Sequence, residues 1–289
     1  MEGRLYVYDA ESKYTAFESN ASGSNRVAIF IPGLTDGPLS LPYLPLLAAT
    51  LSAHAFSVVQ PILPSSYTQY GTSSLRNDAV YIDKLVAHLV HQRGGRALQL
   101  VLIGHSTGCQ NIIHFLKTAR LDVARMVVAI VLQAAVSDRE YMMWRDAPKT
   151  SRLIEAAKAL HPDDLLPRDA DLSPITASRY LSLATRLGDD DMFSSDLTDD
   201  ELKSVFSGVR KGMVVGIFLS GADEYVPSHV DVNFLIQRWR NVLVKQQAFA
   251  VTAKVIDKAD HALSDSKVQE NFCSGVDDII QKALTKGSY

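Results

Sequence analysis

The chain has 289 residues, of which 47% are apolar and 21% charged, and its formal net charge is −3. These values are typical of a globular protein with a large core, and they exclude the strongly basic surface that nucleic-acid phosphates require. No apolar stretch reaches the ~18 residues of a membrane-spanning helix, and the first residues lack the features of a secretory signal. We therefore expect a cytoplasmic enzyme that neither binds nucleic acid nor spans a membrane.

Short apolar runs alternate with longer helical patterns along most of the chain. A leading hairpin is expected from Leu5–Tyr8 and Thr15–Glu18. Six later runs have the length and β-branched content of buried strands: Arg26–Ile31, Phe56–Gln60, Leu98–Ile103, Met126–Leu132, Met213–Leu219 and Phe249–Ile256. Helical patterns lie at about 40–54, 75–92, 108–119, 230–243 and 265–285. This alternation predicts an α/β protein with a doubly wound, mostly parallel sheet.

The segment from about 138 to 212 breaks this alternation. Ser151–His161 and Pro174–Leu187 have amphipathic helical patterns with no strand between them. Unstructured connections longer than about 12–15 residues are uncommon in compact domains. We therefore predict one domain over residues 1–289, with a helical cap insertion at about 138–212 that lies over one edge of the sheet.

The strongest chemical motif is Gly104-His105-Ser106-Thr107-Gly108, a G-x-S-x-G. It directly follows a predicted strand and opens a predicted helix, which is the context of a nucleophile elbow. Glycines two residues on either side leave room for the sharp turn, and the helix N-terminus points towards developing negative charge. The motif therefore predicts Ser106 as a nucleophile.

A serine nucleophile needs a histidine base, and the base needs an orienting carboxylate. In this architecture the acid and then the histidine follow the serine along the chain. Asp223 lies in the loop after the strand at 213–219, and His261 lies in the loop after the last predicted strand. We therefore predict Asp223 as the acid and His261 as the base.

Three other carboxylates compete with Asp223 for the role of the acid. Glu224 is its direct neighbour, and Asp138 follows the strand at 126–132, where some proteins of this architecture carry the acid. Asp260 adjoins His261 but is poorly placed to reach the ring of its own neighbour. All three remain alternatives at this point.

The oxyanion hole is expected to consist of two backbone N–H groups. One comes from Thr107, the residue after the nucleophile. The other comes from the loop at 31–37, where Gly33 gives the backbone freedom. Leu34 is the expected donor in that loop, and Thr35 is the alternative.

Together these motifs resemble the α/β-hydrolase superfamily over nearly the whole chain. The stretches IPGLTDGPLSLPYLPLLAATL and VLIGHSTGCQNIIHFLK are more narrowly similar to an uncharacterised eukaryotic branch of that superfamily. This branch contains fungal esterases that hydrolyse fusarinine-type siderophores. The resemblance implies a serine ester hydrolase with Ser106, Asp223 and His261 in the triad positions.

Missing motifs narrow the choice of function. The chain has no G-x-G-x-x-G after a strand, no P-loop and no H-E-x-x-H, so we expect neither a cofactor nor a metal. Cys109, three residues after Ser106, is expected to be a small buried residue rather than a nucleophile. Two classes remain: an esterase acting on a small-molecule ester through an acyl-enzyme, and a non-catalytic receptor of the same fold. A thioesterase or acyltransferase also stays open, and the sequence does not indicate the oligomeric state.

The predicted insertion is strongly acidic. Its run Asp189–Glu201 holds seven carboxylates, which we expect to be solvated. Residues 161–201 contain eleven acidic and three basic residues, so this segment carries −8 and the rest of the chain +5. If the insertion covers Ser106, its field predicts a preference for cationic or neutral esters over anionic ones.

Overall fold

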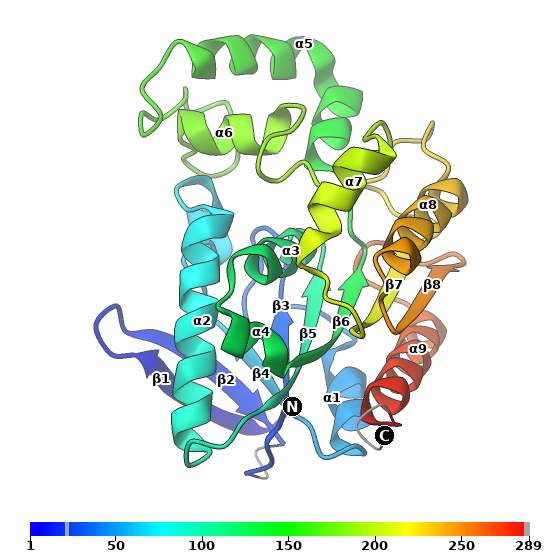
Figure 1. The fold of residues 1–289 in the computed structure, drawn as a ribbon. Coiled ribbons are helices and arrows are strands. Elements are labelled where there is room, and N and C mark those ends of the chain that lie inside the picture. The colour runs from blue at the N-terminus through cyan, green and yellow to red at the C-terminus, as the bar shows by residue number, and fades with distance from the viewer. Residues whose placement is uncertain (21–22, 286–289) are drawn as a thin grey trace.

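The apolar runs of the sequence form an eight-stranded sheet with the order β1-β2-β4-β3-β5-β6-β7-β8 (Figure 1). The protein is described by a computed structural model over residues 1–20 and 23–285. The pairs β1–β2 and β2–β4 are antiparallel, and the other five neighbouring pairs are parallel. The strands are β1 (Gly3–Asp9), β2 (Tyr14–Ser19), β3 (Arg26–Ile31), β4 (Ser57–Pro61), β5 (Gln99–His105), β6 (Val127–Gln133), β7 (Val214–Ser220) and β8 (Ala250–Ile256).

Helices cover both faces of this sheet. The α-helices are α1 (Leu44–Ser52), α2 (Leu75–Gln92), α3 (Gly108–Thr118), α4 (Leu121–Met126), α5 (Asp138–Lys158), α6 (Ala177–Ala184), α7 (Asp199–Val205), α8 (Val232–Lys245) and α9 (Ser266–Thr285). Two 3₁₀ turns are η1 (Tyr67–Gly71) and η2 (Phe206–Gly208). Within the described residues, none of the helices is both long enough and apolar enough to cross a membrane.

Side chains of the central strands alternate between two apolar cores. In β3, Val27 and Ile29 belong to the core that α2, α3 and α8 cover, whereas Ala28 and Phe30 belong to the core that α1 and α9 cover. Burial on both faces explains why these strands are nearly continuous apolar runs. In sheets of this kind, the loops that follow the carboxyl ends of the parallel strands carry the polar residues of a site.

The predicted doubly wound sheet is confirmed. All six predicted strands and both hairpin strands are present, with bounds that differ by at most two residues. Four predicted helices agree equally well, and α1 begins four residues later than expected, at Leu44. The short helix α4, in the connection to β6, was not expected from the sequence.

The segment between β6 and β7 contains α5, α6 and α7, and α5 and α6 lie above the carboxyl ends of the strands (Figure 1). The segment has its own apolar cluster, in which Leu153 of α5 packs with Tyr180 and Leu183 of α6. Helix α5 begins at Asp138, thirteen residues before the predicted helix, because the Ser137 hydroxyl caps the N–H of Glu140 at 3.0 Å. It is kinked at Asp146, two residues before Pro148.

The expectation of a solvated acidic run is wrong for two of its seven carboxylates. Asp190 and Asp191 are buried, with 2% and 5% of their surface exposed. Asp190 forms an ion pair with the buried Arg179, and Asp191 pairs with Arg139 at 3.1 Å. Arg139 lies outside residues 161–201, so its ion pair offsets one of the eight net negative charges of that segment, whereas Arg179 is already included in that sum.

Candidate active site

Ser106 occupies a sharp turn between β5 and α3. Its φ of 53° lies in the left-handed region that L-residues seldom adopt. The turn is held from outside, because Ser106 N–H donates to the carbonyl of Gln133 on β6 at 3.0 Å. Its own carbonyl accepts from Cys109 N–H at 2.9 Å. The structure thus places Ser106 at the strained strand-to-helix turn that the motif predicts.

Three glycines make room for this turn. A Cβ on Gly108 would lie 2.1 Å from the carbonyl oxygen of Ile31, and one on Gly104 would lie 2.7 Å from the backbone of Gly108. A Cβ on Gly33 would lie 2.8 Å from Cβ of Ser106. The loop after β3 therefore packs directly against the serine side chain.

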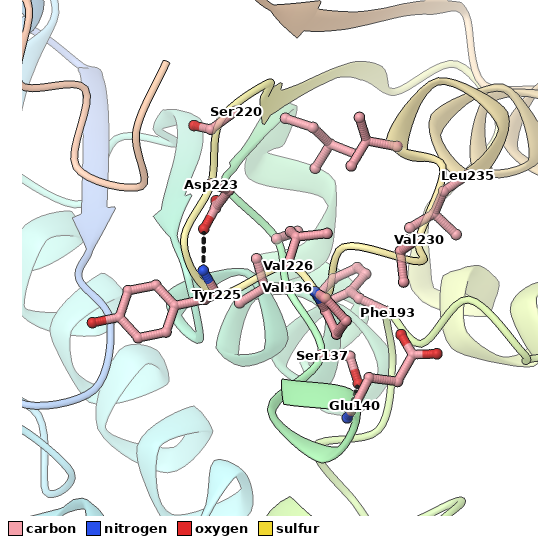
Figure 2. Close-up of a pocket in the computed structure, with 14 residues that line it drawn as sticks. Val136, Ser137, Glu140, Phe193, Ser220, Asp223, Tyr225, Val226, Val230 and Leu235 are labelled. Atoms are coloured by element: carbon pink, nitrogen blue, oxygen red, sulfur yellow. Dashed lines mark hydrogen bonds between the residues drawn. The ribbon is translucent and has the colours of Figure 1, made fainter. Parts of the chain in front are cut away.

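His261 and Asp223 meet at the carboxyl ends of the last two strands. His261 Nδ1 lies 2.9 Å from both carboxylate oxygens of Asp223, and both residues are buried. Asp223 also accepts the N–H of Tyr225 at 3.0 Å (Figure 2). Behind the carboxylate lies a cavity of about 20 Å³ with mostly apolar lining, including Val226, Val230 and Leu235 (Figure 2).

The backbone of His261 is held on both sides. Its N–H donates to the carboxylate of Glu224 at 3.0 Å, and its carbonyl accepts from Nε2 of Gln133 at 3.2 Å. The ring of Tyr225 packs against the imidazole, with 4.6 Å between the ring centres. Glu224 therefore contacts the histidine through the main chain, whereas Asp223 contacts the ring.

Gln133, which the sequence analysis did not single out, connects several parts of the site. It is fully buried at the end of β6. Its Oε1 accepts from the hydroxyl of Tyr43 at 3.1 Å and lies 2.5 Å from His105 Nδ1. Burial, together with the charge of His261, lowers the pKa of His105 to about 3. His105 is therefore neutral at physiological pH.

Ser106 and His261 line one cavity of about 460 Å³. The sheet side contributes Leu34 and Glu224, and the segment between β6 and β7 contributes Asp138, Tyr141 and Asp171. Within the described residues, no hydrogen bond joins the serine hydroxyl to the imidazole. Contacts of this kind commonly tighten only when substrate binds.

The expected oxyanion donors border the nucleophile. The N–H groups of Leu34 and Thr107 have no hydrogen-bond partner in the part of the chain that the structure describes, and neither has that of Thr35. Leu34 and Thr35 both line the cavity, and Thr35 has a φ of 66°. Backbone N–H groups are normally paired, so unpaired ones beside a nucleophile are available to bind an oxyanion.

Asp260 and Asp138, the other competing acids, contact other groups. Asp260 accepts the N–H of Ser264 at 2.7 Å. Asp138 is half-buried at the start of α5, and its Oδ2 lies 3.4 Å from Nε2 of Gln110. Neither carboxylate hydrogen-bonds to His261 in residues 1–20 and 23–285.

Cys109 is fully buried, and its sulfur donates to the carbonyls of Gly104 and Gln133 at 3.4 Å. Burial raises the pKa of this thiol. The residue is thus buried and inert, as expected. Within the described residues, no group of three or more His, Cys, Asp and Glu side chains could hold a metal ion.

The Gly33→Ala variant should lose roughly 10²-fold or more in kcat. The added Cβ displaces either the nucleophile or the Leu34 N–H, and the loss of one oxyanion donor costs about this much. Steady-state kinetics on an activated ester measure the effect. Gly94→Ala is the control for activity: its φ of 68° makes alanine cost stability, but nothing lies within 4 Å of that Cβ to be displaced. Equal activity in both variants would contradict the close approach.

A pH-dependent stability effect is expected from Asp138. Burial and the charge of Asp190 raise its pKa to about 7, above the ~3.9 of an unfolded chain. The folded state therefore binds the extra proton between these values, and this carboxyl makes stability fall as the pH rises from about 4 to about 7.

Asp138→Asn removes that penalty, so its melting temperature should rise relative to the wild type between pH 4 and pH 8. The exposed residue Asp163, in the segment between β6 and β7, gives the matched control Asp163→Asn. Thermal unfolding at both pH values measures the difference. A gap between wild type and Asp138→Asn that is independent of pH would refute the assignment.

Comparison with known proteins gives matches along almost the whole chain. A family described as a protein of unknown function, DUF1749, matches residues 2–282. The fusarinine C esterase sidJ of Aspergillus fumigatus is 32% identical over 325 residues, covering 93% of this chain and 92% of that protein. Esterase AN6793 of Emericella nidulans is 30% identical over 302 residues, covering 82% and 80%.

Similar solved structures identify the fold. The siderophore hydrolase EstB from Aspergillus fumigatus superposes with a TM-score of 0.80 at 28% identity, covering 98% of both chains. An α/β-hydrolase-fold protein of unknown function gives 0.72 at 19% identity, covering 100% of this chain and 98% of that chain. The predicted α/β-hydrolase fold is therefore confirmed, as is the resemblance to the siderophore-esterase branch.

Proposed function

The chain belongs to the DUF1749 family, and from this membership and the geometry of its site we propose that it is a serine esterase. In this proposal Ser106, His261 and Asp223 form the catalytic triad. The observation that carries it is the hydrogen bond between His261 and Asp223 at 2.9 Å, in a cavity that also contains Ser106 in its strained turn.

The proposed reaction has two steps. His261 accepts the proton of the Ser106 hydroxyl as its oxygen attacks the ester carbonyl, and the imidazolium then returns a proton to the leaving alcohol. Water attacks the acyl-enzyme in the second step, with His261 as its base, and releases the acid and Ser106. Asp223 keeps the imidazole in the tautomer that has its proton on Nδ1 and stabilises the imidazolium.

Two backbone N–H groups stabilise the oxyanion in each step. We assign them to Leu34 and Thr107, which flank the nucleophile on two separate loops. A donor aimed at the developing charge contributes roughly 3 kcal/mol to transition-state stabilisation. Residues 138–212 act as a cap in this proposal, because four of them, Asp138, Tyr141, Asp171 and Leu172, line the same cavity.

Siderophore-type esters are the proposed substrates. The support is the similarity to a fusarinine C esterase and to a siderophore hydrolase that aligns over nearly the full length of both chains. The test is a panel of esters that includes simple acyl esters, thioesters and a ferric fusarinine-type siderophore, with the products followed by mass spectrometry.

We expect Ser106-dependent hydrolysis of the oxygen esters, including the siderophore. If the protein bound these compounds without turnover, it would be a receptor of the same fold. Acylation of an added alcohol or amine in preference to water would instead identify an acyltransferase.

A further inference from the structure

The tautomer of His105 is determined by a chain of hydrogen bonds. The carbonyl of His261 can only accept, so the amide nitrogen of Gln133 must face it, at 3.2 Å. The amide oxygen of Gln133 then faces Nδ1 of His105, at 2.5 Å. An oxygen acceptor requires a proton on that nitrogen, and His105 is neutral because its pKa is lowered to about 3. Its Nε2 therefore carries a free lone pair.

The lone pair on Nε2 of His105 belongs to a residue of the cavity lining. His105 is 98% buried, since only 2% of its surface is exposed, and it lines the cavity that contains Ser106. The structure gives Nε2 no hydrogen-bond partner within the described residues. The Nδ1 edge of the ring is turned to Gln133, while Cδ2, next to Nε2, borders Gly33, another residue of the cavity lining. Nε2 is not one of the fully buried polar atoms that lack a partner, so it is accessible from the cavity, where a ligand's donor can take the place of water.

The carboxyl groups of the cavity add further hydrogen-bond acceptors. Four carboxylates line it, those of Asp36, Asp138, Asp171 and Glu224, and no lysine or arginine is among the described lining residues. Asp171 accepts from the Tyr70 hydroxyl and Asp36 from the Ser40 hydroxyl, both of them side chains of the cavity lining. A substrate that brings donors suits this lining better than one that brings further acceptors or negative charge.

We propose that His105 is a specificity-determining residue, whose Nε2 accepts a hydrogen bond from a hydroxyl or ammonium group close to the scissile ester carbonyl. The proposal rests on the proposed esterase function and names the substrate class: esters with such a donor near the ester group. The closeness to the carbonyl follows from Gly33, because a Cβ there would lie 3.3 Å from Oγ of Ser106 and 3.4 Å from Cδ2 of His105.

Two matched series of esters test this. The first contains 4-nitrophenyl butanoate with hydrogen, hydroxyl, methoxy or ammonium at carbon 3 of the acyl chain. The second compares ethyl with 2-hydroxyethyl butanoate. In at least one series the donor-bearing ester should have a kcat/KM about tenfold above that of the ester without the donor, as expected for one hydrogen bond. The methoxy ester, which can only accept, should show no gain.

The variant His105→Asn removes Nε2 and so tests its role as the hydrogen-bond acceptor. The asparagine amide can still donate to Gln133 from near the Nδ1 position, but it has no atom where Nε2 stood. We expect the hydroxyl-to-hydrogen ratio of kcat/KM to fall about tenfold, to near 1, in a variant whose melting temperature shows that it folds. His114→Asn is the control, because His114 lies on α3 outside this cavity, and the ratio should not change.

The outcomes separate this proposal from the proposed function. If no ester is hydrolysed by the wild type, the esterase assignment fails. If the unsubstituted ester is hydrolysed through Ser106 but neither series shows a preference for the donor, only the role of His105 is refuted. A preference that persists in folded His105→Asn also refutes it. Should that variant fail to fold, the hydroxyl and methoxy esters compared on the wild type still decide whether a donor is selected.

Discussion

Ser106→Ala is expected to lower kcat by roughly 10⁴–10⁶ on any ester that the wild type hydrolyses well. The alanine lacks the hydroxyl that forms the acyl-enzyme, while the backbone hydrogen bond to Gln133 remains available to hold the turn. The loss should appear in kcat rather than in KM, because binding in the cavity does not need the hydroxyl. Steady-state kinetics on a chromogenic ester measure it.

Folding of the alanine variant is checked by its melting temperature. Cys109→Ala serves as the matched control, because it makes a similarly small change on the same helix turn and keeps the N–H that donates to the Ser106 carbonyl. We expect that control to retain most of its turnover. More than a tenth of wild-type turnover in Ser106→Ala would show that another residue carries the reaction.

Asp223→Asn should cost roughly 10⁴ in kcat. The amide can present its N–H₂ group to His261 Nδ1, which stabilises the imidazole tautomer that cannot accept the serine proton. Because the carboxylate lies 2.9 Å from Nδ1 with both oxygens, the substitution acts on the ring directly. The measurement is kcat for Asp223→Asn beside two variants of neighbouring acids.

The two comparison variants are Glu224→Gln and Asp138→Asn. We expect the kcat of both to fall far less than that of Asp223→Asn. Glutamine still offers an oxygen to the N–H of His261, which is the contact that Glu224 makes. Asp138 makes no hydrogen bond to the histidine within the described residues. If Asp138→Asn lost most of its kcat while Asp223→Asn stayed near the wild-type value, the catalytic acid would be Asp138, after β6, instead of Asp223, after β7.

The fold was largely predictable from local patterns. Strands buried on both faces, such as Val127–Gln133, are apolar at every position before the last, and helices such as Leu75–Gln92 show the expected periodicity and a Ser74 cap. The positions predicted for the triad also followed from local order, because Ser106, Asp223 and His261 each lie just after a strand. Each of these features is contained within a few consecutive residues.

Features that depend on distant contacts were not predictable in this way. Asp190 and Asp191 belong to an acidic run, and only the positions of Arg179 and Arg139 in the folded chain show why they are buried. Gln133 ends an apolar strand and has no motif of its own. Its importance comes from hydrogen bonds to residues 28 and 128 positions away along the chain, which no local pattern encodes.

The most direct test of the account is the site at which a fluorophosphonate reacts. Such a probe phosphonylates the serine that a neighbouring histidine base activates, and peptide mass spectrometry locates the adduct. The account predicts one adduct, on the peptide that contains Ser106, with loss of esterase activity in proportion to labelling and no adduct in Ser106→Ala. An unlabelled but folded and ester-hydrolysing protein, or an adduct on a different serine, would contradict it.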